Sequence, residues 1–466
     1  MERREGKTRA QQVTGRNSLT SMLTTAVNKL DALIVDDKRN GPELFERLLI
    51  AQHDLGLLQG DRPTCPALRP HILSRTKYQA IKTAAESIAN AFEKLVRHAL
   101  NDPALLRVMG LTAAEEEMAR MDPGYDRLCV TSRLDSYLTE EGFQFLEYNA
   151  ESPAGVGDQM QLEKLLFGLP HMKQFLESHE HWAPQPHREL LRSLLTIYRD
   201  WGGQEEYPQI AIVDWNGVPT AGEFRILKTY FEESGFPAII ADPNELNYNE
   251  DRLNAGDFRI DILYKRVIIH EFLERSNLDH PLTRAYRDKR VCMANSFRSK
   301  VAHKKAGFAV LSDPQYAHLF SDQELEAIRR HIPWTRLVKR GQTTFDNVEH
   351  DLATLIRKER ERFVLKPNDD YGGHGVFLGW ETGTREWEQA LTLALERPYV
   401  VQERAAVQKI LMPMFSATVK LEEMFVDFNP FLFHNKVEGA LIRLSTSSLL
   451  NVTSGGGQTA LLVVED

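Results

Sequence analysis

The chain has few cysteines and lacks any long apolar run. Its 466 residues include only three cysteines, Cys65, Cys129 and Cys292, which lie far apart and form no Cys-x-x-Cys pair. Neither a disulfide framework nor a zinc site is therefore expected, and we predict a reducing, cytoplasmic compartment. No stretch of about 18 uncharged apolar residues is present, so no membrane span is expected.

Positive charge is also scarce relative to negative charge. Lysine and arginine together number 57 against 66 aspartates and glutamates, a net charge of -9. This balance argues against a nucleic-acid or anionic-membrane partner. The first eighteen residues are basic but lack the hydrophobic core of a signal peptide, so a frayed tail is predicted there. The length predicts roughly three domains.

A glycine-rich stretch runs from Phe363 to Phe377, with the sequence Phe-Val-Leu-Lys-Pro-Asn-Asp-Asp-Tyr-Gly-Gly-His-Gly-Val-Phe. A Walker loop would need Gly-Lys-Ser/Thr at the start of a helix, and a dinucleotide fingerprint would need Gly-x-Gly-x-x-Gly there; neither is found in this stretch. Instead, one strand ends at Lys366 and a second begins at Val376, with no helix signal between them.

Glycines in that turn permit positive φ and let backbone N–H groups approach phosphate oxygens, while a lysine at the strand end supplies a fixed cation. The positions concerned are Gly372, Gly373, Gly375 and Lys366. We predict a hairpin that covers phosphate groups. The alternative interpretation is a surface hairpin with a solvated lysine.

A second candidate site lies in a predicted hairpin from Leu128 to Asn149. Its register places Asp135 opposite Glu147 and Arg133 opposite Asn149, and the period of two puts all four side chains on one face. Two opposed carboxylates destabilise a sheet unless a cation lies between them. Oxygens of Asp, Glu and Asn are ligands that Mg²⁺ prefers, so this face predicts a Mg²⁺ site with an arginine in reach of phosphate.

The same alternation predicts that Phe143 and Phe145 share the face of Glu147, so that this face is at least partly covered. The alternative is a solvated strand face on which acidic residues occur by chance.

Helical and strand patterns divide the rest of the chain. Apolar spacing predicts helices through most of residues 19–125, and later over Val301–Leu311 and Phe345–Glu361. Strands at Gln209–Asp214, Ala238–Ala241 and Arg259–Lys265 alternate with helices, which predicts a small parallel α/β layer.

Two further groups of cations are candidates for anion binding. Lys300, Lys304 and Lys305 cluster at the start of the predicted helix near residue 301, where cations oppose the helix dipole and an anion would relieve them. The alternative is a basic, solvated helix face. Arg443 shares a strand face with Leu441, so we predict that it is partly buried and has an anionic partner.

These pieces together resemble a known family. The motifs Arg133-x-Asp135 and Glu147-x-Asn149, followed by Ser-Lys300, Lys366-Pro with its glycine-rich turn, and Ala-Leu-Ile-Arg443, are similar to those of circularly permuted ATP-grasp proteins. Within this family the chain resembles glutathionylspermidine-synthase-like and type 2 permuted ATP-grasp proteins. In ordinary ATP-grasp chains the metal-binding motifs follow the lysine-bearing strands, whereas here they precede them.

The resemblance, which covers roughly residues 125 to 466, implies an α+β or α/β architecture with a permuted ATP-grasp core. It divides the chain into a tail over 1–18, a helical region over 19–125, a metal-site hairpin and helices over 126–205, a small α/β domain over 206–290, and a nucleotide-binding region over 291–466.

It also implies ATP and Mg²⁺ as cofactors and assigns roles to residues. Mg²⁺ would be held by Asp135, Glu147 and Asn149. The nucleotide would be bound by Lys300 (or, alternatively, Lys304), Lys366, Gly372, Gly373 and Gly375, with backbone groups at Gln402 and Glu403 at the hinge strand facing adenine and ribose. Arg133 and Arg443 would be catalytic, because they offset charge on the transferred phosphoryl group.

The implied activity is an ATP-dependent carboxylate–amine ligase that acts through an acyl-phosphate on small-molecule or peptide substrates and releases ADP and phosphate. Two other classes stay open, an ATP-binding module without turnover and a phosphotransferase that stops after phosphorylating its acceptor. The sequence does not separate these classes, because all three need the same metal and phosphate residues.

Overall fold

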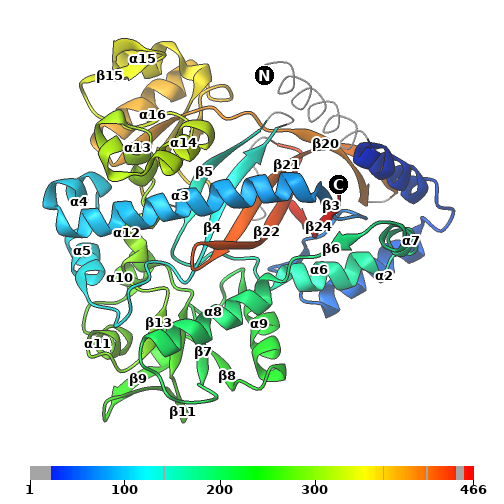
Figure 1. Cartoon of the computed structure of the whole chain (residues 1–466), viewed down its shortest axis with the longest axis horizontal. Helices are drawn as coiled ribbons and strands as arrows, with labels where there is room; N and C mark the ends of the chain where they lie inside the picture. The colour runs from blue at the N-terminus through cyan, green and yellow to red at the C-terminus, as the bar shows by residue number, and fades with distance from the viewer. Residues whose placement is uncertain (1–21, 140–141, 371, 416–417, 448–455) are drawn as a thin grey trace, which may run out of the picture.

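The computed structural model describes residues 22–139, 142–370, 372–415, 418–447 and 456–466. A large antiparallel sheet lies in the middle of the molecule, and smaller units lie on either side of it (Figure 1). The tail predicted for residues 1–18 falls outside the described residues, as does the tip of the hairpin at Glu140 and Glu141.

The central sheet combines an early hairpin with strands from the end of the chain. Its strand order is β23-β22-β21-β4-β5, and β20 also pairs with β21. All of these pairings are antiparallel. The strands are β4 (Thr131–Leu138), β5 (Phe143–Asn149), β20 (Lys409–Phe415), β21 (Val419–Phe433), β22 (Lys436–Ser445) and β23 (Gly457–Thr459).

One face of this sheet is covered by the long helix α3 (Arg75–Asn101), which runs across it in Figure 1. The helix begins after Ser74, whose side chain accepts a hydrogen bond from the backbone N–H of Lys77, a common N-cap arrangement. Its Phe92 ring lies 4.6 Å from the ring of Tyr148 on β5. Because side chains alternate along a strand, the neighbours of Tyr148 face the opposite side of the sheet.

The register of the β4–β5 hairpin is the predicted one. Arg133 pairs with Asn149 and Asp135 with Glu147, which confirms the prediction. A bulge follows on β5: Ser136 pairs with Phe145, so Leu146 is an extra residue with no partner on β4. The extra residue turns Phe145 into the core beneath α3, so the prediction that Phe143 and Phe145 share the face of Glu147 is wrong.

A helical region precedes the hairpin, as predicted for this part of the chain. It comprises a helix over residues 22–35, α2 (Pro42–Asp54), α3, α4 (Pro103–Met109) and α5 (Ala113–Arg120), with the short strands β1 (Leu58–Gln59) and β2 (Arg62–Pro63). After the hairpin come α6 (Asp158–Phe167), α7 (Pro170–Ser178) and α8 (Pro186–Asp200).

The predicted parallel layer is confirmed. Its strand order is β13-β12-β7-β8 with every pairing parallel. The strands are β7 (Ile210–Val213), β8 (Ala238–Ala241), β12 (Ile262–Lys265) and β13 (Cys292–Ala294), accompanied by α9 (Ala221–Glu233), the small sheet β9 (Leu246–Asn249), β10 (Arg252–Ala255) and β11 (Phe258–Arg259), and the helices η1 (Pro243–Glu245), α10 (Ile269–Arg275) and α11 (Pro281–Arg287). Strand β13, assigned above to the region after residue 290, is thus an edge strand of this sheet.

A buried asparagine ties this layer to the central sheet. The Asn295 side chain accepts hydrogen bonds from the backbone N–H of Val130 (2.6 Å) and Thr131 (3.0 Å) and donates to the carbonyl of Ala150 (2.7 Å). Both ends of the β4–β5 hairpin are therefore held at one point.

The third sheet has the order β14-β19-β17-β18 and is antiparallel. Its elements are β14 (Thr335–Leu337), β17 (Phe363–Pro367), β18 (Phe377–Leu378) and β19 (Tyr399–Glu403), packed with η2 (Pro314–Leu319), α14 (Asp322–His331), α15 (Leu352–Lys358), η3 (Arg360–Arg362) and α16 (Thr384–Glu396).

Two predicted helices here are wrong in part. Only the end of 345–361 is helical, because β15 (Gln342–Phe345) and β16 (Val348–Asp351) form a hairpin. Asp346 and Asn347 sit at its tip with φ of 50° and 63°, a conformation that both residue types tolerate in tight turns. The helix over 301–311 is divided into α12 (Ser299–His303) and α13 (Ala306–Leu311), since Lys304 is extended.

The end of the chain returns to its beginning. Strand β24 (Leu461–Val464) pairs in parallel with β3 (His71–Ser74) and antiparallel with β6 (His181–Trp182). The three cysteines are buried and unpaired. None of the helices in the described ranges has the length and apolar character that a membrane crossing requires.

Candidate functional site

A cavity of 530 Å³ is lined by residues of the central sheet and of the third sheet, and by residues that follow strands β7 and β12 of the parallel layer. The predicted site residues that line it are Arg133, Asp135, Glu147, Asn149, Lys366, Gly372, Gly373, Gln402, Glu403 and Arg443. Lys300 and Gly375 are the predicted site residues that do not. Segments that are distant in the sequence are therefore brought to one place.

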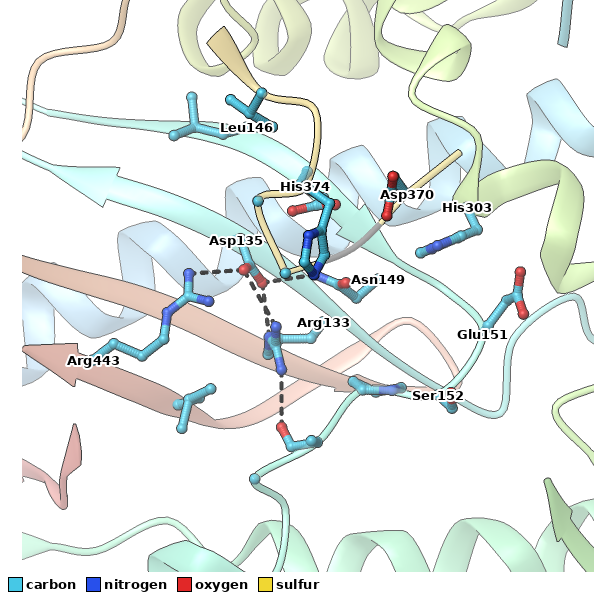
Figure 2. Close-up of a pocket in the computed structure, with 18 of the residues that line it drawn as sticks. Arg133, Asp135, Leu146, Asn149, Glu151, Ser152, His303, Asp370, His374 and Arg443 are labelled. Atoms are coloured by element: carbon cyan, nitrogen blue, oxygen red, sulfur yellow. Dashed lines mark hydrogen bonds and ion pairs between the residues drawn. The ribbon is translucent and has the colours of Figure 1, made fainter. Parts of the chain in front are cut away.

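Asp135 is the centre of the charge network in this cavity (Figure 2). Its Oδ1 accepts hydrogen bonds from Arg133 Nε (2.7 Å) and Asn149 Nδ2 (2.9 Å), and its Oδ2 accepts one from Arg443 Nη2 (2.8 Å). Burial by itself would raise the pKa of Asp135, but the attraction of the two guanidinium groups outweighs it and lowers the pKa to about 2. The carboxylate is consequently ionised at neutral pH.

Arg443 is held from behind by a second carboxylate. Its side chain is 13% exposed, and its Nε donates to Oδ2 of the fully buried Asp427 at 2.7 Å. Asn429 Nδ2 donates to the other oxygen of Asp427 at 2.7 Å. The prediction that Arg443 is partly buried with an anionic partner is confirmed, and these contacts fix its guanidinium at the cavity wall.

Two lysines lie near Glu147, one of the predicted metal ligands. Lys305 Nζ is 2.8 Å from Glu147 Oε1, and Lys366 Nζ donates to Gln402 Oε1 at 2.7 Å. Burial deprives Lys366 of water and lowers its pKa to about 8, although Glu147 attracts the charged form. An ammonium held so weakly by neutral oxygens is suited to an incoming phosphate.

The glycine-rich hairpin has the predicted backbone conformation. Gly372, Gly373 and Gly375 have φ of 69°, 80° and 66°, which confirms the positive φ expected of them. The base of the hairpin is anchored by Asn368, whose side chain donates to the carbonyl of Met109 and accepts from the N–H of Ala306, both at 2.8 Å. The hairpin is therefore fixed at its base and reaches over the cavity.

The hinge strand lies beside this hairpin. In β19, Gln402 pairs with Val364 on one side and Thr335 on the other. The Glu403 N–H already donates to the carbonyl of Trp334 at 2.8 Å. That N–H is therefore not available to bind adenine. The predicted contact between the hinge strand and adenine would have to use other backbone groups of β19.

Lys300 lies behind the cavity wall. It is fully buried, and its Nζ is 2.7 Å from Asp369 Oδ1 and 2.9 Å from Glu151 Oε1. Lys304, the alternative, is buried between Glu115 (2.8 Å) and Asp369 (2.6 Å). The interpretation of these lysines as a solvated helix face is wrong, because carboxylates from distant segments enclose them. The lysine of this cluster that does line the cavity is Lys305.

The predicted metal ligands fit Mg²⁺ by their chemistry, since two carboxylates and a side-chain amide lie together on the cavity wall, the amide of Asn149 here directing its Nδ2 at Asp135. Both oxygens of Asp135 are engaged by arginines here, so an ion would exchange with one of these donors. A second group, Glu151, His303 and Asp369, has ligand atoms within 4.8 Å of one another. Its two carboxylates, however, already hold the ammonium groups of Lys300 and Lys304.

Further residues of the cavity were not predicted. Asp214 and Arg266 come directly after the parallel strands β7 and β12, and Glu223 and Asp158 lie beside them on the wall. The carboxyl ends of parallel strands commonly form ligand sites, so this signal was present in the sequence for Asp214 and Arg266. Desolvation, followed by repulsion from Glu223, raises the pKa of Asp158 to about 7.

No family model matches the chain. A curated protein of Frankia casuarinae named "Putative glutamate--cysteine ligase 2-2" is 25% identical over 232 residues, which are 47% of this chain and 25% of that protein. The chain therefore spans about a quarter of the length of this curated relative.

Two solved structures are similar to the chain. A glutathione synthetase-like effector from Globodera pallida, solved without ligand, has a TM-score of 0.57 at 12% identity and is matched over 92% of this chain and 99% of its own. The two proteins share a fold. A structure titled "Putative gamma-glutamylcysteine synthetase", from Methylobacillus flagellatus, has a TM-score of 0.42 at 10% identity, over 84% of this chain and 89% of its own, which is too low to support an argument.

Proposed function

We propose that this protein is an ATP-dependent carboxylate–amine ligase that forms an amide or peptide bond through an acyl-phosphate. The proposal rests mainly on one observation: a single cavity contains oxygen donors suited to Mg²⁺, several buried cations and a glycine hairpin with positive φ. The name of the Frankia relative, a glutamate–cysteine ligase, and that of the Globodera neighbour, a glutathione synthetase-like protein, support the same class.

We also propose that the fold is a circularly permuted ATP-grasp. The β4–β5 hairpin, which bears the predicted metal ligands, precedes strand β17 with Lys366 in the chain. The hairpin nevertheless pairs with β21, which comes from the end of the chain. This arrangement is what a permuted order requires, because an early segment completes a sheet that is otherwise built late.

The charges of the cavity support phosphoryl transfer. Arg133, Arg443, Lys305 and Lys366 are cations, whereas Asp135, Asp427 and Glu147 are anions, so this part of the site has one excess positive charge. Fixed cations in a site of low dielectric stabilise charge that spreads over phosphoryl oxygens in the transition state. Mg²⁺ held by Asp135, Glu147 and Asn149 would, when bound, neutralise further phosphate charge.

In this mechanism the triphosphate of ATP lies between the glycine hairpin and the β4–β5 face. A substrate carboxylate attacks the γ-phosphate, ADP leaves, and an amine then displaces phosphate from the acyl-phosphate. Arg133 and Arg443, fixed by Asp135 and Asp427, orient the phosphoryl oxygens. The hairpin excludes water, which would otherwise hydrolyse the acyl-phosphate.

The test is hydroxamate formation from Mg-ATP, hydroxylamine and pooled amino acids, short peptides and polyamines. Hydroxylamine traps activated acyl groups, so wild-type protein should form hydroxamate and release ADP. Asp135→Asn and Lys366→Ala should each lower the rate about a hundredfold, the typical effect of removing one electrostatic contact in an active site. Lys409→Ala is the matched control, because Lys409 pairs with Glu423 on an exposed part of β20.

The outcomes separate three classes of protein. Hydroxamate from the wild type and the control, but not from the two site variants, would establish carboxylate activation. ADP release without hydroxamate would identify a phosphotransferase instead. Tight ATP binding with no ADP release from any pool would refute the ligase and leave a binding module.

A further inference from the structure

His303 is a buried histidine whose ring has no hydrogen-bond partner. It ends helix α12, is only 5% exposed and lines the cavity described above. Neither Nδ1 nor Nε2 has a hydrogen-bond partner among the described residues. Figure 2 shows the ring projecting from its ribbon into the pocket.

Because the ring lies on the cavity wall, a ligand bound in the cavity would supply the hydrogen bond that the described residues do not. Charged groups of both signs act on the His303 ring. Glu151 and Asp369 attract a proton to the ring, while Lys300 and Lys305 repel it. Burial has the largest effect and lowers the pKa of His303 below its ordinary value. The resting imidazole is therefore neutral at neutral pH, with one nitrogen available as an acceptor.

The surroundings of the ring can nevertheless hold a proton for a short time. Behind it, the carboxylates of Glu115, Glu151 and Asp369 surround the ammonium groups of Lys300 and Lys304. The buried ammonium of Lys265 also attracts Glu151, so three anions face three cations in this cluster. A His303 imidazolium would be stabilised by its attraction to Glu151 and Asp369.

We propose that His303 accepts a proton from the ammonium group of the amine substrate, in a step that rests on the ligase function proposed above. Most amines carry a proton at neutral pH and are not nucleophilic until they lose it. Transfer to the imidazole gives a neutral amine and an imidazolium. The amine nitrogen then forms the C–N bond, the bond from the acyl carbon to the phosphate oxygen breaks, and the second N–H proton leaves with phosphate.

The test uses two nucleophiles that differ in their need for a base. Hydroxylamine is largely unprotonated at neutral pH and needs none, whereas the amino acids and polyamines of the pool do. His303→Gln should keep hydroxamate formation within about twofold of wild type, but lose about a hundredfold of amide formation at neutral pH. The deficit in amide formation should shrink toward alkaline pH, because the free amine becomes more abundant.

The matched control is His71→Gln. His71 is also buried, and both of its ring nitrogens lack partners, but it lies on β3 and is not part of the cavity wall. This variant should leave both rates unchanged.

Three results would overturn the assignment of His303 alone: an equal loss of hydroxamate and amide, a loss of amide that does not change with pH, or no loss of amide. The same selective loss in His71→Gln would also overturn it. If the wild type makes no hydroxamate, the ligase function itself fails, and this step fails with it.

Discussion

At the scale of single residues, two carboxylates of one cavity have opposite properties. Asp135 faces two guanidinium groups, and its pKa is lowered to about 2. Burial of Asp158, followed by repulsion from Glu223, raises its pKa to about 7, although Gln458 donates a hydrogen bond to it. Burial acts on both carboxylates, so the cations beside Asp135 keep it ionised, whereas Asp158 can exchange a proton near neutral pH.

The raised pKa of Asp158 predicts a pH-dependent cost in stability. The unfolded value is about 3.9, so the folded protein binds the proton more tightly than the unfolded chain. This contribution to stability is complete below about pH 4 and is lost as the pH rises to about 7. Asp158→Asn is always uncharged, so we expect it to be more stable than wild type by roughly 2 kcal/mol at pH 8, with a smaller difference at pH 5.

Urea unfolding at the two pH values measures this difference. The control is Asp200→Asn, because Asp200 is exposed at the end of α8 and should show no such gain. A variant that is less stable than wild type at pH 8 would show that Asp158 is ionised and paired in the folded protein.

At the scale of elements, the sequence predicted pairs of strands better than their environment. The predicted register holds for the pairs Asp135–Glu147 and Arg133–Asn149 and fails beyond them, where the bulge intervenes. The bulge at Leu146 was missed, although one extra residue inverts a pattern of period two: Phe143 and Phe145 stand at odd positions and Tyr148 at an even one, yet all three pack in the same core. The burial of Lys300 was not predictable for a different reason: its partners Glu151 and Asp369 come from distant segments, and only the folded chain brings them together.

The glycine-rich hairpin can be tested as an element. Gly375 has a φ of 66°, and a Cβ there would come within 2.8 Å of Pro367 Cγ and 3.0 Å of Tyr399 Oη. Gly375→Ala should therefore strain the turn by about 1–2 kcal/mol and weaken ATP binding about tenfold, although no charge is removed. Titration calorimetry with ATP measures the change.

The matched control for the hairpin is Gly383→Ala. Gly383 precedes α16 with a φ of -63°, and a Cβ there meets nothing within 4 Å. Equal affinities for ATP in both variants would show that the conformation of the hairpin does not contribute to nucleotide binding.

At the scale of the whole molecule, the site exists only where separate sheets meet. The resemblance to ATP-grasp proteins predicted that an early hairpin completes a late sheet; the local pattern of residues could not, because β4 and β21 are separated by most of the chain. Buried hydrogen bonds of Asn295 join the parallel layer to the central sheet, and those of Asn368 join the glycine-rich hairpin to helices α4 and α13. A ligand in the cavity would add contacts between these same units.

Mg-ATP should therefore stabilise the whole fold. A ligand that binds only the folded state raises the free energy of unfolding by about 2.7 kcal/mol at a concentration one hundred times its Kd, and thermal unfolding would show a higher Tm. ATP without Mg²⁺ should give a smaller rise, because no divalent cation would then link the phosphates to Asp135 and Glu147. Lys366→Ala should lose most of the rise, and Lys409→Ala should keep it. An unchanged Tm of the wild type at millimolar Mg-ATP would contradict nucleotide binding in this cavity.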